Sequence, residues 1–140
     1  GSRAWRRARE NDPLAHPSWN LNLECLYDAK DFFFLTTDIN GSQPLSESLA
    51  DRCSRILADK TGTEIPCRPI AFLTGGTDAG ETARAGVAAT TLMGMPWTTD
   101  SQSAVYHTPK DVTDAVSAEA VEASLYLAGA LADELDGELG

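Results

Sequence analysis

Apolar and polar residues alternate with period two over residues 19–25, W-N-L-N-L-E-C. Successive side chains of a strand point to opposite faces of a sheet, so this pattern predicts a strand with one apolar face and with Glu24 near its end. Residues 31–37, D-F-F-F-L-T-T, are aromatic and β-branched and predict a second strand. The turn-forming residues 27–30 between the two segments favour a hairpin of these strands.

Apolar residues at spacings of three and four predict two amphipathic helices. The first is capped by Ser42 or Gln43, has Pro44 in its first turn and ends at Gly62. Its buried stripe is expected to contain Leu45, Leu49, Cys53, Ile56 and Leu57. The second is capped by Ser117. Its buried stripe is expected to contain Val121, Leu125, Ala128, Leu131 and Leu135.

Shorter signals predict the remaining elements. They are a helix over 1–10, a strand over 68–74, a helix over 78–85, a strand over 87–95 and an irregular loop over 96–116. The Thr77 hydroxyl can cap the helix of 78–85. Strands and helices thus alternate along the chain, which predicts one α/β domain over 1–140 with a mixed, mostly parallel sheet flanked by helices.

Charge and cysteine content narrow the classes of partner. The 140 residues contain 21 acidic and 11 basic side chains, a formal net charge of −10. This charge repels phosphate backbones and anionic lipids, which argues against nucleic-acid and membrane-surface partners. No apolar run reaches the ~18 residues that a membrane helix needs. Three scattered cysteines without metal-site spacing predict free thiols in a reducing compartment, hence a cytoplasmic protein.

Residues able to do chemistry lie where the predicted strands end: Glu24, Asp78 in the G-G-T-D-A-G turn, and His107 beside Tyr106. Each also has a purely structural interpretation. Glu24 can be a polar position on a half-exposed strand, Asp78 a carboxylate at a helix N-terminus, and His107 an ordinary loop histidine. The turn lacks the lysine of a Walker motif and the third glycine of a dinucleotide fingerprint, so a phosphate loop is set aside.

Three segments together resemble a known superfamily. N-L-E-C at 22–25, G-G-T-D-A-G-E-T-A-R-A-G-V-A-A-T-T-L at 75–92 and Y-H-T-P-K-D at 106–111 are similar, in order and spacing, to the C-terminal half of the co-catalytic dizinc exopeptidases. This superfamily contains the leucyl aminopeptidases and the glutamate carboxypeptidases. The resemblance covers roughly residues 1–136 and implies a three-layer zinc-peptidase sandwich, here partial.

The resemblance also implies roles for individual residues. Glu24 matches an acidic ligand of one zinc ion, His107 the histidine ligand of the other, and Tyr106 a side chain near the reaction centre. Three more residues are implied to line the substrate cleft or to order its loops: Thr77, Asp78 and Asp111. The implied reaction is hydrolysis of a peptide or aminoacyl substrate by a water that two zinc ions activate.

In the superfamily, a first histidine, a bridging aspartate and a Glu-Glu pair containing the general base precede this region. G-S-R-A-W at 1–5 resembles the segment that comes directly after that pair. We therefore expect a truncated domain that lacks its N-terminal half, exposes a sheet edge prone to self-association, and is inactive alone. The alternative is a peptidase-like domain without catalysis that serves as a binding or dimerisation module.

Overall fold

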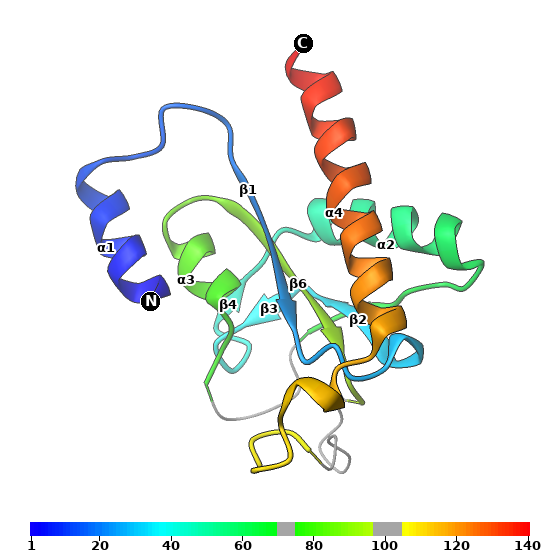
Figure 1. The fold of residues 1–140 in the computed structure, drawn as a ribbon. Coiled ribbons are helices and arrows are strands. Elements are labelled where there is room, and N and C mark those ends of the chain that lie inside the picture. Colours follow the sequence, from blue (N-terminus) through cyan, green and yellow to red (C-terminus); the bar gives the residue numbers. More distant parts are fainter. Residues whose placement is uncertain (70–74, 97–104) are drawn as a thin grey trace.

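The structure, a computed structural model, describes residues 1–69, 75–96 and 105–140 (Figure 1). Its elements in chain order are α1 (Ser2–Asn11), β1 (Trp19–Glu24), the 3-10 turn η1 (Ala29–Asp31), β2 (Phe32–Leu35), β3 (Thr37–Asp38), β4 (Gln43–Pro44), α2 (Glu47–Thr61), β5 (Cys67–Arg68), α3 (Asp78–Arg84), β6 (Ala88–Gly94), the 3-10 turn η2 (Thr113–Ala115) and α4 (Ala118–Leu139). Most of the strand predicted over 68–74 lies outside the described residues, as does part of the loop predicted over 96–116.

Four strands form a mixed sheet in the order β1-β6-β2-β5. β1 is parallel to β6 and β2 is parallel to β5, while β2 and β6 are antiparallel. The predicted hairpin of the first two strands is wrong, because β6 lies between them and Leu92 pairs with Leu23 on one side and with Phe34 on the other. β2 and β6 are buried almost throughout and take the central positions, whereas the half-exposed β1 takes an edge.

Helices cover both faces of the sheet and make three layers (Figure 1). Side chains of β2 alternate between two cores: Phe32 and Phe34 pack with residues of α2 and α4, and Phe33 and Leu35 pack with Ala79 of α3. The predicted α/β class with a mixed, mostly parallel sheet between helices is confirmed. Within the described residues, no helix is long and apolar enough to cross a membrane.

α2 begins later than the sequence predicts. Gln43 and Pro44 form β4, which pairs with β3, and the Ser46 hydroxyl then caps the helix by accepting from the Leu49 amide at 3.2 Å. Gly62 ends the helix in the left-handed conformation, with a φ of 70°. The predicted buried stripe is confirmed except for Leu45, which is buried ahead of the helix in the other core.

α4 is capped by Ser117 as predicted, but its buried face is different. The buried residues are Ala120, Ala123, Ser124, Leu127, Leu131 and Leu135. Leu125 is 69% exposed, Val121 is 37% exposed and Ala128 is exposed as well, so the prediction is wrong for these three positions. α4 carries apolar residues on two faces, and the face with small residues packs inward because it allows close contact with α2 and the sheet.

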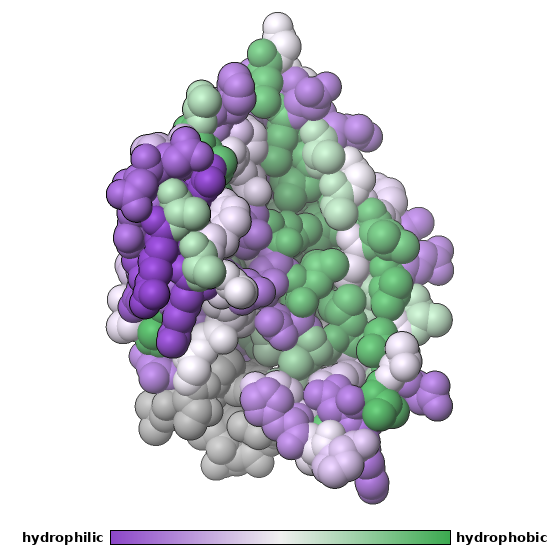
Figure 2. Space-filling view, turned by 60° about the vertical axis from the view of Figure 1, so that its left-hand side comes forward, coloured by the Kyte–Doolittle hydropathy of each residue, from purple (hydrophilic) through white to green (hydrophobic). Residues whose placement is uncertain are grey.

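One broad face of the molecule is apolar. β1 is an edge strand, and among the described residues it pairs only with β6. Trp19 and Leu21 pack against the core, but Leu23 is 41% exposed. Figure 2 shows this apolar surface in the centre and at the right of the view, beside a hydrophilic region at the left. Exposed apolar surface beside a strand that has one edge without a partner in the described residues is typical of an interaction site.

Candidate functional site

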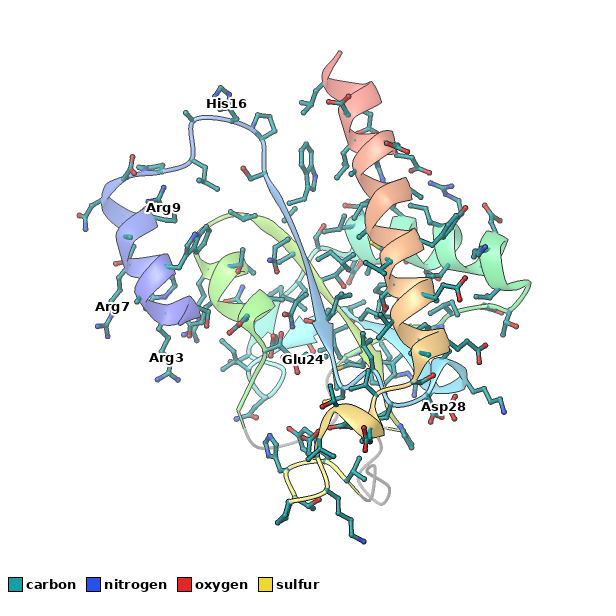
Figure 3. All side chains as sticks on the ribbon, in the orientation of Figure 1. Arg3, Arg7, Arg9, His16, Glu24 and Asp28 are labelled. Carbon is teal, nitrogen blue, oxygen red and sulfur yellow. The ribbon has the colours of Figure 1, made fainter. Side chains whose placement is uncertain are left out.

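Glu24 ends β1 at the edge of the sheet, and Figure 3 shows it at the end of β1 away from His16. Its carboxylate accepts from the Asn22 amide, with 3.4 Å between Nδ2 and Oε1. Burial raises the pKa of Glu24, the Asn22 hydrogen bond opposes this, and the charges of Asp78 and Asp38 raise the pKa further. His107 lowers it. Glu24 therefore shares an electrostatic environment with residues from two distant segments.

The sequence analysis missed Asp38, which is fully buried at the end of β3. Its carboxylate accepts from three backbone amides, those of Ile39 at 2.6 Å, Thr77 at 3.0 Å and Gly80 at 3.0 Å. It also accepts from the Thr77 hydroxyl at 2.5 Å. One carboxylate thus fixes the start of α3, and the available signal was an acid that follows a buried aromatic strand.

Asp38 explains two of the three glycines of the G-G-T-D-A-G turn, whereas Gly75 is explained by its left-handed backbone, with a φ of 79°. A Cβ atom on Gly76 would lie 2.7 Å from Asp38 Oδ1, and one on Gly80 would lie 3.0 Å from Oδ2. The turn is glycine-rich because Asp38 approaches its backbone closely. Thr77 caps α3 as predicted, since its hydroxyl oxygen accepts from the Ala79 amide at 3.2 Å.

A chain of hydrogen bonds connects this turn with Glu24. The Thr77 hydroxyl donates to Asp38, so its oxygen can accept from the Thr91 hydroxyl, 2.8 Å away. The Thr91 oxygen accepts from the Asn22 amide at 3.3 Å, and the same amide donates to Glu24. Each side-chain donor in this chain has an acceptor, so the network holds Glu24 relative to the α3 turn.

Tyr106 and His107 lie in the third segment. Their rings are stacked with centroids 3.9 Å apart, and His107 has a left-handed backbone with a φ of 55°. Burial raises the pKa of Tyr106, and electrostatic interactions with Cys25, Glu24 and Asp111 raise it further. The phenol therefore stays protonated at neutral pH and can donate a hydrogen bond.

A hydrogen bond of Asp111 connects this loop to the sheet. Its Oδ1 accepts from the Tyr27 hydroxyl at 2.7 Å. The backbone amides of Tyr27 and Asp28 in turn donate to the carbonyl of Gly94 at the end of β6. Within the loop, the Asp111 amide donates to the Thr108 carbonyl. Asp111 thereby orders the segment that carries His107.

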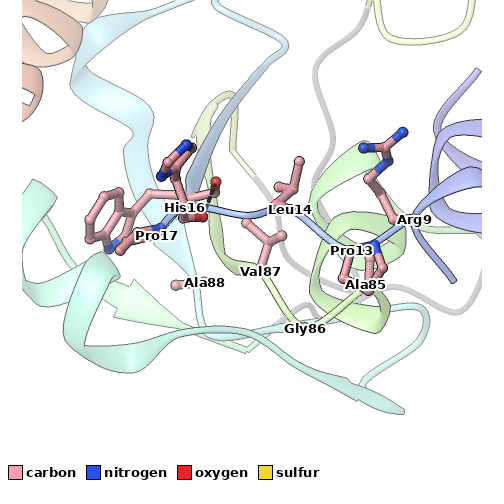
Figure 4. A pocket seen from close by; sticks show the side chains of 11 residues that line it. Arg9, Pro13, Leu14, His16, Pro17, Ala85, Gly86, Val87 and Ala88 are labelled. Carbon is pink, nitrogen blue, oxygen red and sulfur yellow. Dashed lines mark hydrogen bonds between the residues drawn. The ribbon is translucent and has the colours of Figure 1, made fainter. Parts of the chain in front are cut away.

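The structure connects most of the predicted site residues to Glu24 and leaves Asp111 apart from them. Hydrogen bonds join Glu24 to Thr77, and electrostatic interactions link Glu24 to Asp78, Tyr106 and His107. Asp111 is outside this hydrogen-bonded chain, because its carboxylate accepts from the Tyr27 hydroxyl. His16, the other histidine, lies beyond the opposite end of β1, where a pocket of about 470 Å³ opens between it, Trp19 and Val87 (Figures 3 and 4).

Glu24 and His107 offer the donors that zinc prefers in proteins, a carboxylate oxygen and an imidazole nitrogen. However, the described residues contain no group of three or more histidine, cysteine, aspartate or glutamate side chains placed to hold a metal ion. The donors fit zinc in kind but not in number, since a zinc site takes three or four protein ligands. The described part of the chain does not form a complete zinc site by itself.

Comparison with known proteins decides the family. The model of peptidase family M28 matches residues 1–132, nearly the whole chain. The chain belongs to peptidase family M28. M28 proteins are zinc-dependent metallopeptidases, so the resemblance to the dizinc exopeptidases is confirmed at the family level. No curated protein and no solved structure matches the chain significantly.

Proposed function

We propose that this M28 chain is part of a zinc-dependent exopeptidase of the aminopeptidase type. Glu24 is a ligand of one of two zinc ions and His107 a ligand of the other. The observation that carries this proposal is the half-buried carboxylate at the end of β1, which is oriented by Asn22 and lies in the electrostatic environment of His107. A carboxylate and an imidazole from separate segments are the ligand types that this chemistry needs.

Bound zinc supplies an activated water and polarises the scissile carbonyl. The side chains of this chain orient the metal ligand and stabilise the charge that develops on the substrate. Asn22 fixes the Glu24 carboxylate through its amide, and the protonated phenol of Tyr106 donates to the oxyanion that develops on the carbonyl. Thr77 and Asp78 line the substrate cleft, and a general base from outside the described site transfers the proton of the water to the leaving amine.

A further polypeptide segment completes this site in our proposal. Two ligands from the described residues are too few, and β1 offers an unpaired edge that ends at Glu24. A strand that pairs in parallel with β1 would end beside Glu24, where its last residues could supply the missing ligands and the base. The exposed Leu23 adds apolar surface on the face of the sheet next to this edge, which a partner segment could cover.

The experiment compares the 140-residue chain with a complete M28 domain that contains it. The chain alone should hold less than stoichiometric zinc and should not hydrolyse aminoacyl-p-nitroanilides. In the complete domain, His107→Ala should remove one equivalent of zinc and most of the activity, while the matched control His16→Ala should change neither. Unchanged zinc content in His107→Ala would contradict the ligand role. Stoichiometric dizinc with turnover by the chain alone would contradict the incomplete site.

A second candidate function is a peptidase-like binding module without catalysis. The absence of a group of three metal-binding side chains in the described ranges favours it. The same assay separates the two functions, because the module predicts that the complete domain binds peptide but neither retains zinc nor hydrolyses the anilide.

A further inference from the structure

A second pocket opens beside the Thr77 turn. It has a volume of about 330 Å³ and opens between the start of α1, the turn at Ile39 and Asn40, and α3. Thr77 and Asp78 both line it, and hydrogen bonds from Thr77 through Thr91 and Asn22 connect this wall of the pocket to Glu24. Its volume suits one amino-acid residue. A substrate held near Glu24 can therefore place one side chain here.

Two arginines, Arg3 and Arg84, line the same pocket together with Glu81. Figure 3 shows Arg3 at the start of α1. Arg3 Nε lies 3.5 Å and Arg84 Nη1 lies 3.6 Å from Glu81 Oε1. Both distances are too long for strong hydrogen bonds, so most guanidinium N–H groups of these arginines face the pocket or solvent.

Glu81 does not need these two arginines for its charge to be satisfied. The Arg6 guanidinium donates to Glu81 Oε2 at 2.7 Å, and the Arg6 side chain is only 23% exposed. The Arg3 side chain, by contrast, is 83% exposed, and such an exposed ion pair contributes little to holding α1 against α3. The ion pair of Arg6 with Glu81 connects α1 to α3, and Arg3 and Arg84 add positive charge to the wall of the pocket.

We infer that this pocket is a subsite for a substrate residue with a carboxylate side chain, so that the peptidase prefers peptides beginning with glutamate or aspartate. The inference rests on the proposed function. The ammonium group of such a residue faces Asp78, and its side-chain carboxylate accepts from Arg3 and Arg84. Guanidinium groups bind carboxylates in a planar, two-bond geometry, and a neutral amide of the same shape cannot replace the charge.

The test measures binding to the 140-residue chain, so it does not depend on zinc or turnover. The dipeptides Glu-Gly and Gln-Gly, which differ in one charge, are titrated separately while the amide resonances of Gly75 and Gly76 are followed by NMR. Glu-Gly should bind about tenfold more tightly, and 0.5 M salt should reduce this preference because the arginines are exposed. Equal affinities would overturn the inference.

Variants show which residues carry the preference. The double variant Arg3→Gln, Arg84→Gln should bind both dipeptides within about twofold of each other. The matched control Arg55→Gln, which removes an arginine that pairs with Glu134 far from this pocket, should keep the preference. A preference that survives in the double variant would overturn the inference, and circular dichroism melts establish that each variant is folded.

The outcomes separate this inference from the proposed function. Equal binding of the dipeptides, together with loss of zinc from His107→Ala in the complete domain, would refute the subsite alone. A charge preference without hydrolysis by the complete domain would support an acidic-peptide site and refute the peptidase function.

Discussion

Replacement of Asp38 by asparagine tests the support of the site most directly. The buried carboxylate accepts from the Ile39, Thr77 and Gly80 amides and from the Thr77 hydroxyl, and its two oxygens share these donors. Asparagine keeps one oxygen and puts an NH2 group against donors that then have no acceptor. Losing about two hydrogen bonds to a charged acceptor, at about 1.5–3 kcal/mol each, should lower the free energy of unfolding by about 3–6 kcal/mol.

Urea denaturation followed by circular dichroism measures this change, with the slope of the transition compared between variants. Asp133→Asn is the matched control, because Asp133 is an exposed carboxylate on α4, and it should change the free energy of unfolding by less than about 0.5 kcal/mol. A loss below about 1 kcal/mol in Asp38→Asn would refute the view that this carboxylate fixes the α3 turn.

Three further predictions concern stability and reactivity. Burial tends to raise the pKa of Glu81, but its hydrogen bond to Arg6 and the charges of the neighbouring arginines prevail and lower it. Glu81→Gln should therefore destabilise the fold at pH 7, and in urea melts this loss should shrink as the pH falls below the unfolded pKa and through the lowered folded pKa. Burial raises the pKa of the Cys53 thiol to about 12 and of Cys67 to about 11, so iodoacetamide at pH 7.5 should label Cys67 slowly and Cys53 only after unfolding. Leu127→Ala should lower the free energy of unfolding by about 2–5 kcal/mol and Leu125→Ala by less than about 0.5 kcal/mol, and similar losses in urea melts would contradict the assigned buried face of α4.

Local signals in the sequence predicted most of the elements. Thr77 and Ser117 cap helices as their positions indicate, and the period-two pattern places β1 correctly. Pairing of strands was harder to predict, because the sequence shows which segments are extended but not that β6, far along the chain, separates β1 from β2. The short connection between β1 and β2 favours a hairpin of these two strands. The buried strand β6 takes the central position between them instead, since it is covered on both faces.

The buried face of α4 shows a different limit. Val121 and Leu125 follow a helical period as well as Leu127 and Leu131 do, so periodicity alone offers two stripes. Tertiary packing selects the stripe that includes Ala120. The other stripe stays exposed on the described part of the chain. Periodicity predicts that a helix is amphipathic, but a helix with two apolar faces needs its neighbours to decide between them.

The same distinction between local and long-range signals applies to the site. Motifs predicted Glu24 and His107, but not Asp38, whose partners are 39 and 42 residues away along the chain. The network from Asp38 to Asn22 is satisfied by the chain itself, whereas Glu24 at its end receives one long hydrogen bond and lies near two acids that raise its pKa. A carboxylate held rigidly in an unfavourable negative environment gains from a nearby cation. In the function proposed above, the hydrogen bonds of this M28 chain orient Glu24, and the zinc ion that it would bind neutralises the charge of the carboxylate.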